Sequence, residues 1–378
     1  MKKTMLIFLS AVLMLSLLAG CGKPADKPDT APDASPQSGS ELQTEERTII
    51  DALGREVKIP AQVKSIVPLG NTPRMVTYLG VADRVVGIGE CEKADSPIKA
   101  YAWVSAKYWE GLPNVGTDAM GETAYYPEVL IETNPDVILC TYAKDVVEDI
   151  AKQTGLPVVA VGQGTLFGED YEQSLRILGE VCGVSERAES IISFINTCLD
   201  DLSQRTKDVP DDKKPTVLAA AATFSGSHGI EGVYSNYPVF KIIAANDVAL
   251  GISEKVGGVL IEKEKVLDWN PDMLFLDFSG AELVKTDYAQ NPGFYKQLKA
   301  VTDGNVYVWP NSTWHWSNVE MPLVSAYYTA ILLYPEEFAD VDFETKAAEI
   351  FGFFIGDGQF LQVLEQAGAG YGKVDLGQ

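Results

Sequence analysis

The chain has 378 residues, with 53 acidic and 30 basic side chains and a formal net charge of −23 at pH 7. A charge of this sign and size argues against a nucleic-acid ligand and against bulk attraction of anionic ligands, whereas it suits a soluble secreted protein. The length exceeds what one compact core usually organises, so we expect two lobes.

The N-terminus carries the pattern of a secretion signal. Two lysines precede an apolar run from Met5 to Leu18, and the run ends in Leu18-Ala19-Gly20-Cys21. A transmembrane anchor is the weaker interpretation, because the run falls short of the ~20 residues that span a bilayer. The final four residues resemble a bacterial lipobox, which implies cleavage before Cys21 and lipid attachment to its sulfur. We therefore expect residues 1–20 to be a lipoprotein signal peptide, and the protein to be extracytoplasmic and lipid-anchored to the cell membrane.

Residues 21–45 are mostly Pro, Asp, Ser, Lys, Thr and Gln, with almost no large apolar side chain. Such a segment buries too little surface to order itself. We expect a disordered tether that holds the globular part off the membrane, although a leader without that use would have the same composition.

Beyond the tether, short apolar strands alternate with helical segments, which favours parallel sheets covered by helices. The expected strands are residues 65–69, 85–88, 137–140, 158–161, 216–219, 273–276 and 305–308. The longest helical pattern runs from about Glu186 to Lys207, with Ile191, Ile195 and Leu202 on one apolar stripe. At ~1.5 Å per residue this helix is about 30 Å long and could bridge two lobes. A core helix within one lobe would show the same pattern.

One pattern occurs twice in the chain. Glu128 to Asp136 contains Asn134-Pro135-Asp136 and is followed by apolar residues, and Glu264 to Asp272 repeats the arrangement. Each copy predicts a short helix stopped at Asn-Pro and then a buried strand, because proline cannot continue a helix. The duplication favours two similar α/β lobes, with the ligand cleft between them. The fold class we expect is therefore α/β, with two Rossmann-like lobes that each have a central parallel sheet and with the long α-helix as the candidate link between them. The expected boundaries are 46–184 for the N-terminal lobe, 185–209 for the interlobe helix and 210–378 for the C-terminal lobe.

Apart from Cys21, the cysteines are Cys91, Cys140, Cys182 and Cys198. No two have C-x-x-C spacing, so they make a poor metal site. Their positions in an expected strand and in helical stretches favour buried free thiols. An extracytoplasmic location permits disulfides, and the three pairings of four cysteines stay open.

From about Thr48 to Gly356 the chain resembles the substrate-binding proteins of ABC importers for iron-siderophore, haem and cobalamin. The likeness lies in an opening hairpin, a first helix-to-strand step, the duplicated Glu-x5-Asn-Pro-Asp motif and a late turn and strand. These segments are residues 49–60, 78–87, 128–136, 264–272 and 300–307. The chain departs from the family at Ala245-Asn246-Asp247, where many members carry Gly-Gly-Asn. The resemblance implies two lobes joined by one rigid helix.

The resemblance also gives the acid at the head of each motif a role. In the family this acid lies on the outer face of its lobe and pairs with arginines of the permease dimer, which implies docking through Glu128 and Glu264. Capping is an alternative and compatible role, since a carboxylate near a helix start is stabilised by the exposed N–H groups. The permease and its ATPase are the expected protein partners.

The ligand is expected outside the carboxyl ends of the strands, in loops that include the Asn71–Arg74 turn and the aromatic-rich stretch 101–109. In the densest loop, residues 309–316, exposed indole and imidazole would suit a tetrapyrrole, a corrin or an aromatic chelate, although core tryptophans would give the same pattern. The candidate ligand-binding residues are Asn71, Thr72, Arg74, Trp103, Tyr125, Tyr126, Thr141, Tyr142, Lys144 and Thr165 in the first lobe, and Ser225, His228, Ser279, Trp309, Trp314, His315 and Trp316 in the second.

The chain has only two histidines, and neutral imidazole binds iron or cobalt readily. His315, with His228, is therefore a candidate axial ligand to a bound metal complex, although a loop histidine more often makes an ordinary hydrogen bond. Arg74 and Lys144 could meet carboxylate or catecholate oxygens, with solvated surface charge as the simpler account. No resident cofactor and no direct protein metal site are expected.

An extracytoplasmic enzyme, a hydrolase or chelatase, is the alternative class, and its usual signatures are missing. The segment 226–229 lacks the G-x-S-x-G arrangement, and the glycines at 162, 164 and 168 do not have dinucleotide-binding spacing. A surface sensor on the same fold is a third alternative. The sequence thus favours a lipid-anchored receptor for an iron complex (siderophore or haem) or a corrinoid, with molybdate or tungstate disfavoured by the few basic loop residues.

Overall fold

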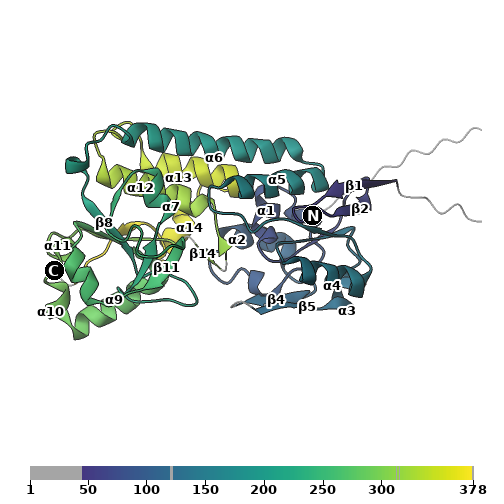
Figure 1. The fold of residues 1–378 in the computed structure, drawn as a ribbon, viewed down its shortest axis with the longest axis horizontal. Coiled ribbons are helices and arrows are strands. Elements are labelled where there is room, and N and C mark those ends of the chain that lie inside the picture. Colours follow the sequence, from purple (N-terminus) through teal and green to yellow (C-terminus); the bar gives the residue numbers. More distant parts are fainter. Residues whose placement is uncertain (1–44, 120–121, 312, 315, 377–378) are drawn as a thin grey trace, which may run out of the picture. The chain divides into compact units, whose positions relative to one another are not determined.

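Two separate sheets form the frame of the protein (Figure 1). The computed structural model describes residues 45–119, 122–311, 313–314 and 316–376, so the expected signal peptide, Cys21 and nearly all of the tether lie outside the described residues. Within the described ranges, no helix combines the length and apolar character needed to cross a membrane. We use "N-terminal lobe" for the elements from β1 to α5 and "C-terminal lobe" for those from β8 onward, with α6 between them.

The N-terminal lobe is built on a three-stranded parallel sheet in the order β3-β6-β7. An antiparallel hairpin, β1-β2, precedes this sheet, and a second hairpin, β4-β5, lies within the lobe. The strands are β1 (Glu46–Ile50), β2 (Glu56–Pro60), β3 (Ile66–Pro68), β4 (Gly116–Ala119), β5 (Glu122–Tyr125), β6 (Val137–Cys140) and β7 (Val158–Ala160). The helices are α1 (Thr72–Tyr78), α2 (Ala100–Trp109), α3 (Pro127–Thr133), α4 (Lys144–Thr154) and α5 (Glu169–Cys182), with short turns η1 (Ala82–Arg84) and η2 (Glu90–Glu92).

The C-terminal lobe contains a larger, mixed sheet in the order β11-β9-β8-β12-β13-β16, with β10 also paired to β8. Its centre, β8-β12-β13, is parallel as expected, whereas β9, β11 and β16 add antiparallel pairs. The strands are β8 (Thr216–Ala220), β9 (Gly232–Ser235), β10 (Asn246–Asp247), β11 (Gly257–Leu260), β12 (Met273–Asp277), β13 (Val306–Trp309), β14 (Thr313–Trp314), β15 (Trp316–Ser317) and β16 (Gly372–Lys373). The helices are α7 (Pro238–Ile242), α8 (Glu264–Trp269), α9 (Phe278–Gln290), α10 (Pro292–Tyr295), α11 (Lys299–Thr302), α12 (Glu320–Leu333), α13 (Phe343–Ile355) and α14 (Phe360–Gln366), after the turn η3 (Asp211–Lys213).

The fold class predicted from the sequence is confirmed, with two local corrections. The expected strand at 85–88 is not a regular strand, because only the isolated bridges Ile66–Val85 and Ile88–Asn114 form there. The stretch 101–109, expected in a loop, is the helix α2. Its aromatic side chains are therefore distributed around a helix, and only some of them point toward one place.

The duplicated motif adopts the same backbone in both lobes. Asn134 ends α3 and Asn270 ends α8, each in the left-handed conformation with φ of 43°. The Asp136 carboxylate then accepts hydrogen bonds from the backbone N–H groups of Lys64 and Ser65, at 2.6 and 3.0 Å. Asp272 plays the matching role at the start of β8, where it accepts from the backbone N–H and the hydroxyl of Thr216, both at 2.7 Å. The motif therefore makes a helix stop and also ties the start of the neighbouring strand.

The long helix α6 (Ser185–Thr206) lies within the helix expected at 185–209, and it packs against α5 of the N-terminal lobe and α12 of the C-terminal lobe (Figure 1). The predicted apolar stripe, Ile191, Ile195 and Leu202 among it, is buried in a hydrophobic core that also contains residues of both lobes. The two lobes thus share one core.

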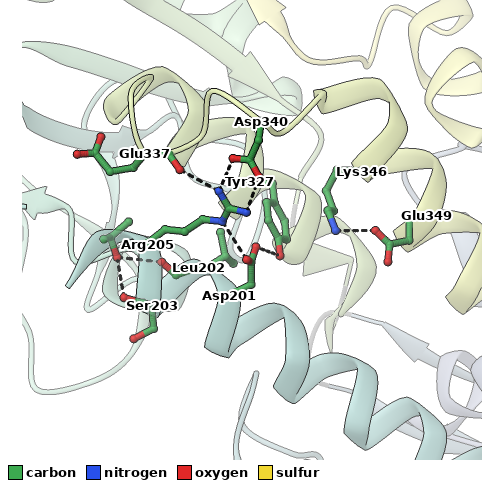
Figure 2. A network of polar contacts seen from close by, with 10 residues as sticks. Asp201, Leu202, Ser203, Arg205, Tyr327, Glu337, Asp340, Lys346 and Glu349 are labelled. Atoms are coloured by element: carbon green, nitrogen blue, oxygen red, sulfur yellow. Dashed lines mark hydrogen bonds and ion pairs between the residues drawn. The ribbon is translucent and has the colours of Figure 1, made fainter. Parts of the chain in front are cut away.

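A charged cluster fixes the C-terminal end of α6 to the second lobe (Figure 2). The Arg205 guanidinium contacts both carboxylate oxygens of Asp340, at 2.6 and 3.0 Å, and also the carboxylate of Asp201 on its own helix at 2.9 Å. The Tyr327 hydroxyl of α12 donates to the other oxygen of Asp201 at 2.8 Å. Two-pronged arginine–carboxylate contacts hold geometry as well as charge, so this end of α6 has a defined position against α12 and the loop before α13.

Candidate functional site

The carboxyl ends of β3, β6 and β7 bring one group of predicted site residues together. The backbone N–H of Asn71 donates to the Thr141 hydroxyl at 3.0 Å, and the Asn71 side chain donates to the carbonyl of Gln163 at 2.7 Å. Gly70 has φ of 65°, and a Cβ there would lie 2.3 Å from the Thr141 hydroxyl oxygen, so the close approach of the two loops requires glycine. Tyr142 is buried beside the same glycine. Asn71, Thr141 and Tyr142 therefore form one cluster, as their places after the neighbouring parallel strands β3 and β6 predict.

The corresponding strand ends of the C-terminal lobe centre on a buried carboxylate. Asp277, at the end of β12, accepts hydrogen bonds from the Tyr234 hydroxyl at 2.7 Å, the backbone N–H of Thr223 at 2.9 Å and the Trp309 indole at 3.0 Å. Burial raises the pKa of Asp277 to about 6, although these hydrogen bonds oppose the shift. Trp309 is fully buried and stacks on Phe275, so it belongs to the core and not to a ligand-facing surface.

Asn311 connects this carboxylate cluster to the first turn of α9. Its side-chain nitrogen donates to the hydroxyls of Thr223 and Ser279, at 2.7 and 2.8 Å, and its oxygen accepts from the backbone N–H of Ser279 at 3.0 Å. The asparagine is completely buried. Ser279 is half-buried at the end of the parallel strands, where the sequence places it among the ligand-binding residues.

Arg74 lies in a buried polar network that crosses from one lobe to the other. Its guanidinium donates to Asn318 of the C-terminal lobe at 3.2 Å, to the Tyr101 hydroxyl at 3.2 Å and to the side chain of Asn71, and it lies over the Tyr101 ring at 4.5 Å. The arginine is fully buried, so a solvated surface charge is the wrong account of it. Because all three guanidinium nitrogens have protein partners, Arg74 reaches a ligand only if this network rearranges.

Two buried carboxyls accompany this arginine. Glu92 accepts a hydrogen bond from the Tyr101 hydroxyl at 2.5 Å. Glu320, at the start of α12, accepts hydrogen bonds from the Tyr78 hydroxyl and from the backbone N–H of Val319. Burial raises the pKa of both carboxyls, and Arg74 lowers each only in part. Burial alone would lower the pKa of Arg74, but its charged and phenolic neighbours raise it overall.

One oxygen of Glu320, Oε1, is buried with no hydrogen-bond partner among the described residues, and the same holds for the Tyr171 hydroxyl. Both groups interact electrostatically with Arg74. The contact between the lobes therefore includes buried titratable groups that lack part of their hydrogen bonding.

The remaining predicted residues of the N-terminal lobe are dispersed. Thr72 is buried and its hydroxyl donates to backbone carbonyls of Leu69 and Leu139, at 2.9 and 3.2 Å, so it holds α1 to the sheet. Thr165 contacts Asp170, Tyr125 contacts Asp149 on α4, and Tyr126 is exposed before α3. Lys144 is exposed, with Glu148 at 3.7 Å, which agrees with a solvated charge.

Trp103 is exposed on α2, where it lines a groove of ≈ 900 Å³ together with Tyr108, Arg187 and Phe353. A second groove, of ≈ 1160 Å³, follows α6 and α13 and has Phe194 and Phe353 in its lining. The residues that line these grooves do not include Thr141 or Ser279. Trp103 is thus placed apart from the strand-end clusters.

In the C-terminal lobe, His228 is half-buried within its own loop. Its Nε2 lies 2.8 Å from the carbonyl of Phe224, and its ring packs against the Phe224 ring, with the two centroids 4.2 Å apart and the planes tilted by 33°. A carbonyl only accepts, so this nitrogen donates, and Nδ1 is the nitrogen left for another contact. Ser225 is exposed in the same loop with φ of 48°.

The densest predicted loop is only partly described. Trp314 and Trp316 lie on the short antiparallel strands β14 and β15, and His315 lies outside the described residues. Among the described residues, no group of three or more His, Cys, Asp or Glu side chains is arranged to hold a metal ion. The four described cysteines are free thiols, with Cys91 half-buried and the other three buried.

Glu128 and Glu264 occupy matching places in the two lobes. Each is exposed and lies in the first turn of its short helix, α3 or α8. An acid at this position is favoured by the helix dipole, although among the described residues neither carboxylate accepts a hydrogen bond from a backbone N–H. The docking role stays a prediction.

The predicted ligand-binding residues omit several members of these clusters. Glu92, Tyr101, Asp277 and Asn311 lie in stretches where ligand loops were expected but were not singled out there, whereas Asn318 and Glu320 lie outside those stretches. A signal was present for Glu320, because it is the only charged residue in the segment 320–333. Asn311 had a signal too, because it lies in the loop 309–316 just after the expected strand 305–308.

A family model described as periplasmic binding protein matches residues 74–313, which include parts of both lobes and all of α6. The chain belongs to the periplasmic binding protein family. Among curated relatives, an uncharacterised ABC transporter substrate-binding lipoprotein of Bacillus subtilis (strain 168), YvrC, is 23% identical over 313 residues, covering 81% of this chain and 90% of the relative. The iron-uptake system-binding protein of the same organism is 26% identical over 194 residues, covering 48% of this chain and 57% of the relative.

Solved structures of similar proteins share the fold. A periplasmic solute-binding protein of Veillonella parvula has a TM-score of 0.65 at 20% identity, with coverage of 82% of this chain and 93% of that one. The periplasmic binding protein MolA of Haemophilus influenzae, solved with molybdate, has a TM-score of 0.63 at 20% identity, with coverage of 82% and 98%. The resemblance stated from the sequence is therefore confirmed at the level of family and two-lobed fold.

Proposed function

We propose that this chain is the solute-binding lipoprotein of an ABC importer, and that it captures an iron complex or a corrinoid between its lobes and delivers it to a permease dimer. The observation that carries the proposal is the family match across both lobes, together with the strand-end clusters in each lobe. The names of the two Bacillus subtilis relatives support the transport role and, for one of them, iron as the cargo.

The ligand proposal rests on the chemistry of the strand-end clusters. They offer amide, hydroxyl and aromatic groups, and the buried Arg74 is engaged by protein partners. Groups of this kind suit a bulky, partly apolar chelate better than a small free oxyanion, which needs several unopposed donors. His315 and His228 stay candidates for an axial contact to a bound metal complex.

The mechanism we propose has no covalent step, so the protein is a receptor and not an enzyme. ATP hydrolysis by the transporter's other subunits supplies the energy for transport. Lipid attachment at Cys21 would place the receptor at the outer side of the membrane, with residues 21–45 as its tether.

The first test is the identity of the ligand. Protein purified from its native host is examined by absorption spectroscopy and mass spectrometry, and then titrated by calorimetry with a ferric tris-hydroxamate, a ferric tris-catecholate, haem, cyanocobalamin and molybdate. Saturable 1:1 binding of an iron complex or the corrinoid supports the proposal, whereas binding of molybdate alone, or of none of the five, contradicts it. His315→Ala tests the axial contact, because loss of a protein ligand shifts the visible spectrum of the bound metal complex.

The second test separates docking from binding. The double variant Glu128→Arg/Glu264→Arg should abolish uptake in cells and leave ligand affinity unchanged, since both side chains are exposed and neither contacts a residue of the strand-end clusters. Glu337→Arg, an exposed acid on the C-terminal lobe, is the matched control for added charge. Normal uptake by the double variant would remove the docking role.

A further inference from the structure

The orientation of the Asn311 side chain is fixed by its surroundings. Asn311 is fully buried beyond the end of β13, and its Oδ1 lies 3.0 Å from the backbone nitrogen of Ser279. A backbone N–H can only donate, so the amide oxygen must face it and the amide nitrogen must face the other way.

The amide nitrogen then determines what two hydroxyl groups can do. It carries two hydrogens and no lone pair for accepting, and it lies 2.7 Å from the Thr223 hydroxyl and 2.8 Å from the Ser279 hydroxyl. Both hydroxyl oxygens must therefore accept from Asn311. Each hydroxyl keeps one proton, which it can only donate elsewhere.

The two protons have different destinations. Asp277 takes a side-chain hydrogen bond from Thr223, so the Thr223 proton is used inside the protein. For Ser279, no acceptor of its hydroxyl proton occurs among the described residues, and the side chain is half-buried at the strand ends. The Ser279 hydroxyl is thus an oriented donor at the position where a ligand is expected.

We propose that Asn311 is a positioning residue that makes the Ser279 hydroxyl a hydrogen-bond donor to the ligand, so that the C-terminal lobe selects a ligand presenting an oxygen acceptor. This inference rests on the proposed function and narrows its ligand class. Carboxylate, hydroxamate and catecholate oxygens of a ferric chelate have the required chemistry, because each is an acceptor and carries negative charge. A ligand that presents only apolar or donor groups to this lobe would leave the hydroxyl unpaired.

The test measures ligand affinity by calorimetry with full-length protein and three probes: a ferric tris-hydroxamate, a ferric tris-catecholate and haem. Ser279→Ala should weaken binding of the preferred probe about tenfold, the effect of one hydrogen bond to a charged acceptor. Ser279→Thr keeps the hydroxyl and should restore most of the affinity. Ser174→Ala is the matched control, because its buried hydroxyl donates to the carbonyl of Gly162 at 3.1 Å within the N-terminal lobe.

Asn311→Asp tests the positioning role. The aspartate oxygen that replaces the amide nitrogen accepts from the hydroxyls, so the Ser279 proton turns inward and affinity should fall as it does in Ser279→Ala. In the Ser279→Ala background, Asn311→Asp should change affinity little further. A merely structural role predicts the opposite, an equal loss in both backgrounds.

The outcomes separate this inference from the proposed function. If a probe binds and Ser279→Ala binds it as tightly as the unmodified protein, the inference is wrong and the receptor role stands. If none of the three probes binds the unmodified protein, the inference is wrong, and binding of cyanocobalamin would still support the receptor role. If neither the probes nor cyanocobalamin bind, the receptor role is contradicted as well. If Asn311→Asp does not fold, the comparison of Ser279→Ala with Ser279→Thr still decides whether the hydroxyl donates to the ligand.

Discussion

The buried carboxyl of Glu320 predicts that the folded protein loses stability as the pH rises above about 5, the upper end of the ordinary glutamate range. Burial raises the pKa of Glu320, and the hydrogen bond from Tyr78 offsets this only in part. The charged and phenolic groups that interact with it are Arg74 and Tyr78 of α1, Tyr171 of α5 and Tyr371 near β16. Because its pKa is raised in the folded state, the folded protein holds a proton that the unfolded chain releases. The stability that the Glu320 proton contributes to the folded protein is fully present at pH values below the ordinary pKa of glutamate. This contribution is lost as the pH rises through the raised pKa of the folded state.

The size of the effect follows from linkage. Each such carboxyl gives a slope of at most about 1.4 kcal/mol per pH unit, and Glu92 and Asp277 act in the same direction. For Asp277, the rise from 3.8 to about 6 corresponds to a loss of about 3 kcal/mol once the pH exceeds that value. Carboxylates with lowered pKa, such as Asp340, act below pH 4 and therefore outside this window.

The assay is urea denaturation followed by circular dichroism at pH 5, 6, 7 and 8. Glu320→Gln keeps the shape of the side chain and an acceptor for Tyr78 but cannot ionise, so its stability should fall less steeply with pH than that of the unmodified protein. Glu337→Gln removes an exposed carboxyl of the same lobe and should follow the unmodified protein. Parallel curves for all three proteins would refute the assignment of the slope to Glu320.

Three further changes test the frame. Asp272→Ala removes the two bonds to Thr216 and should lower the free energy of unfolding by about 1.5–3 kcal/mol, measured by urea denaturation; a loss below 0.5 kcal/mol would contradict the role of the motif as a strand tie. Gly258→Ala places a Cβ 1.9 Å from the Phe224 ring, so it should destabilise by about 1–3 kcal/mol and expose Phe224 to solvent, as chymotrypsin cleavage would detect. Lysine in Arg205→Lys cannot make the two-pronged contact with Asp340, so amide hydrogen exchange at the end of α6 should increase. The free energy of unfolding should fall by only about 1 kcal/mol or less, because the Asp340 carboxylate is largely exposed.

The sequence could predict the frame because the signals that define it are local. The apolar runs at 137–140 and 273–276 begin at the same residues as β6 and β12, and the stripe of α6 follows from helical spacing alone. The segment 85–88 looks like a strand but forms only single bridges, since pairing depends on a neighbour that local pattern does not specify.

The polar clusters could not be predicted in the same way. Arg74 and Asn318 are 244 positions apart, and nothing near either residue indicates its partner. The positions of Thr72 and Trp309 after expected strands suggested that they contact the ligand. In the structure both side chains are buried, and their polar atoms form hydrogen bonds within the protein. A polar residue after a strand therefore signals the neighbourhood of a site, whereas the tertiary structure decides whether it faces ligand or core.

The shared core bears on how the receptor can respond to its ligand. Tyr78 of the N-terminal lobe packs edge-on against Phe354 of the C-terminal lobe at 5.2 Å, and both are buried. Exposing each ring would cost about 1.5–3 kcal/mol, and separating Arg74 from its partner across the lobes would leave a buried charge less well paired. A ligand can shift a conformational equilibrium only by its difference in affinity for the two states. Opening the lobes widely at this contact would cost several kcal/mol, which the ligand's preference for the open state would have to offset. We therefore expect ligand binding to reorganise the strand-end loops, while the shared core and α6 keep their arrangement.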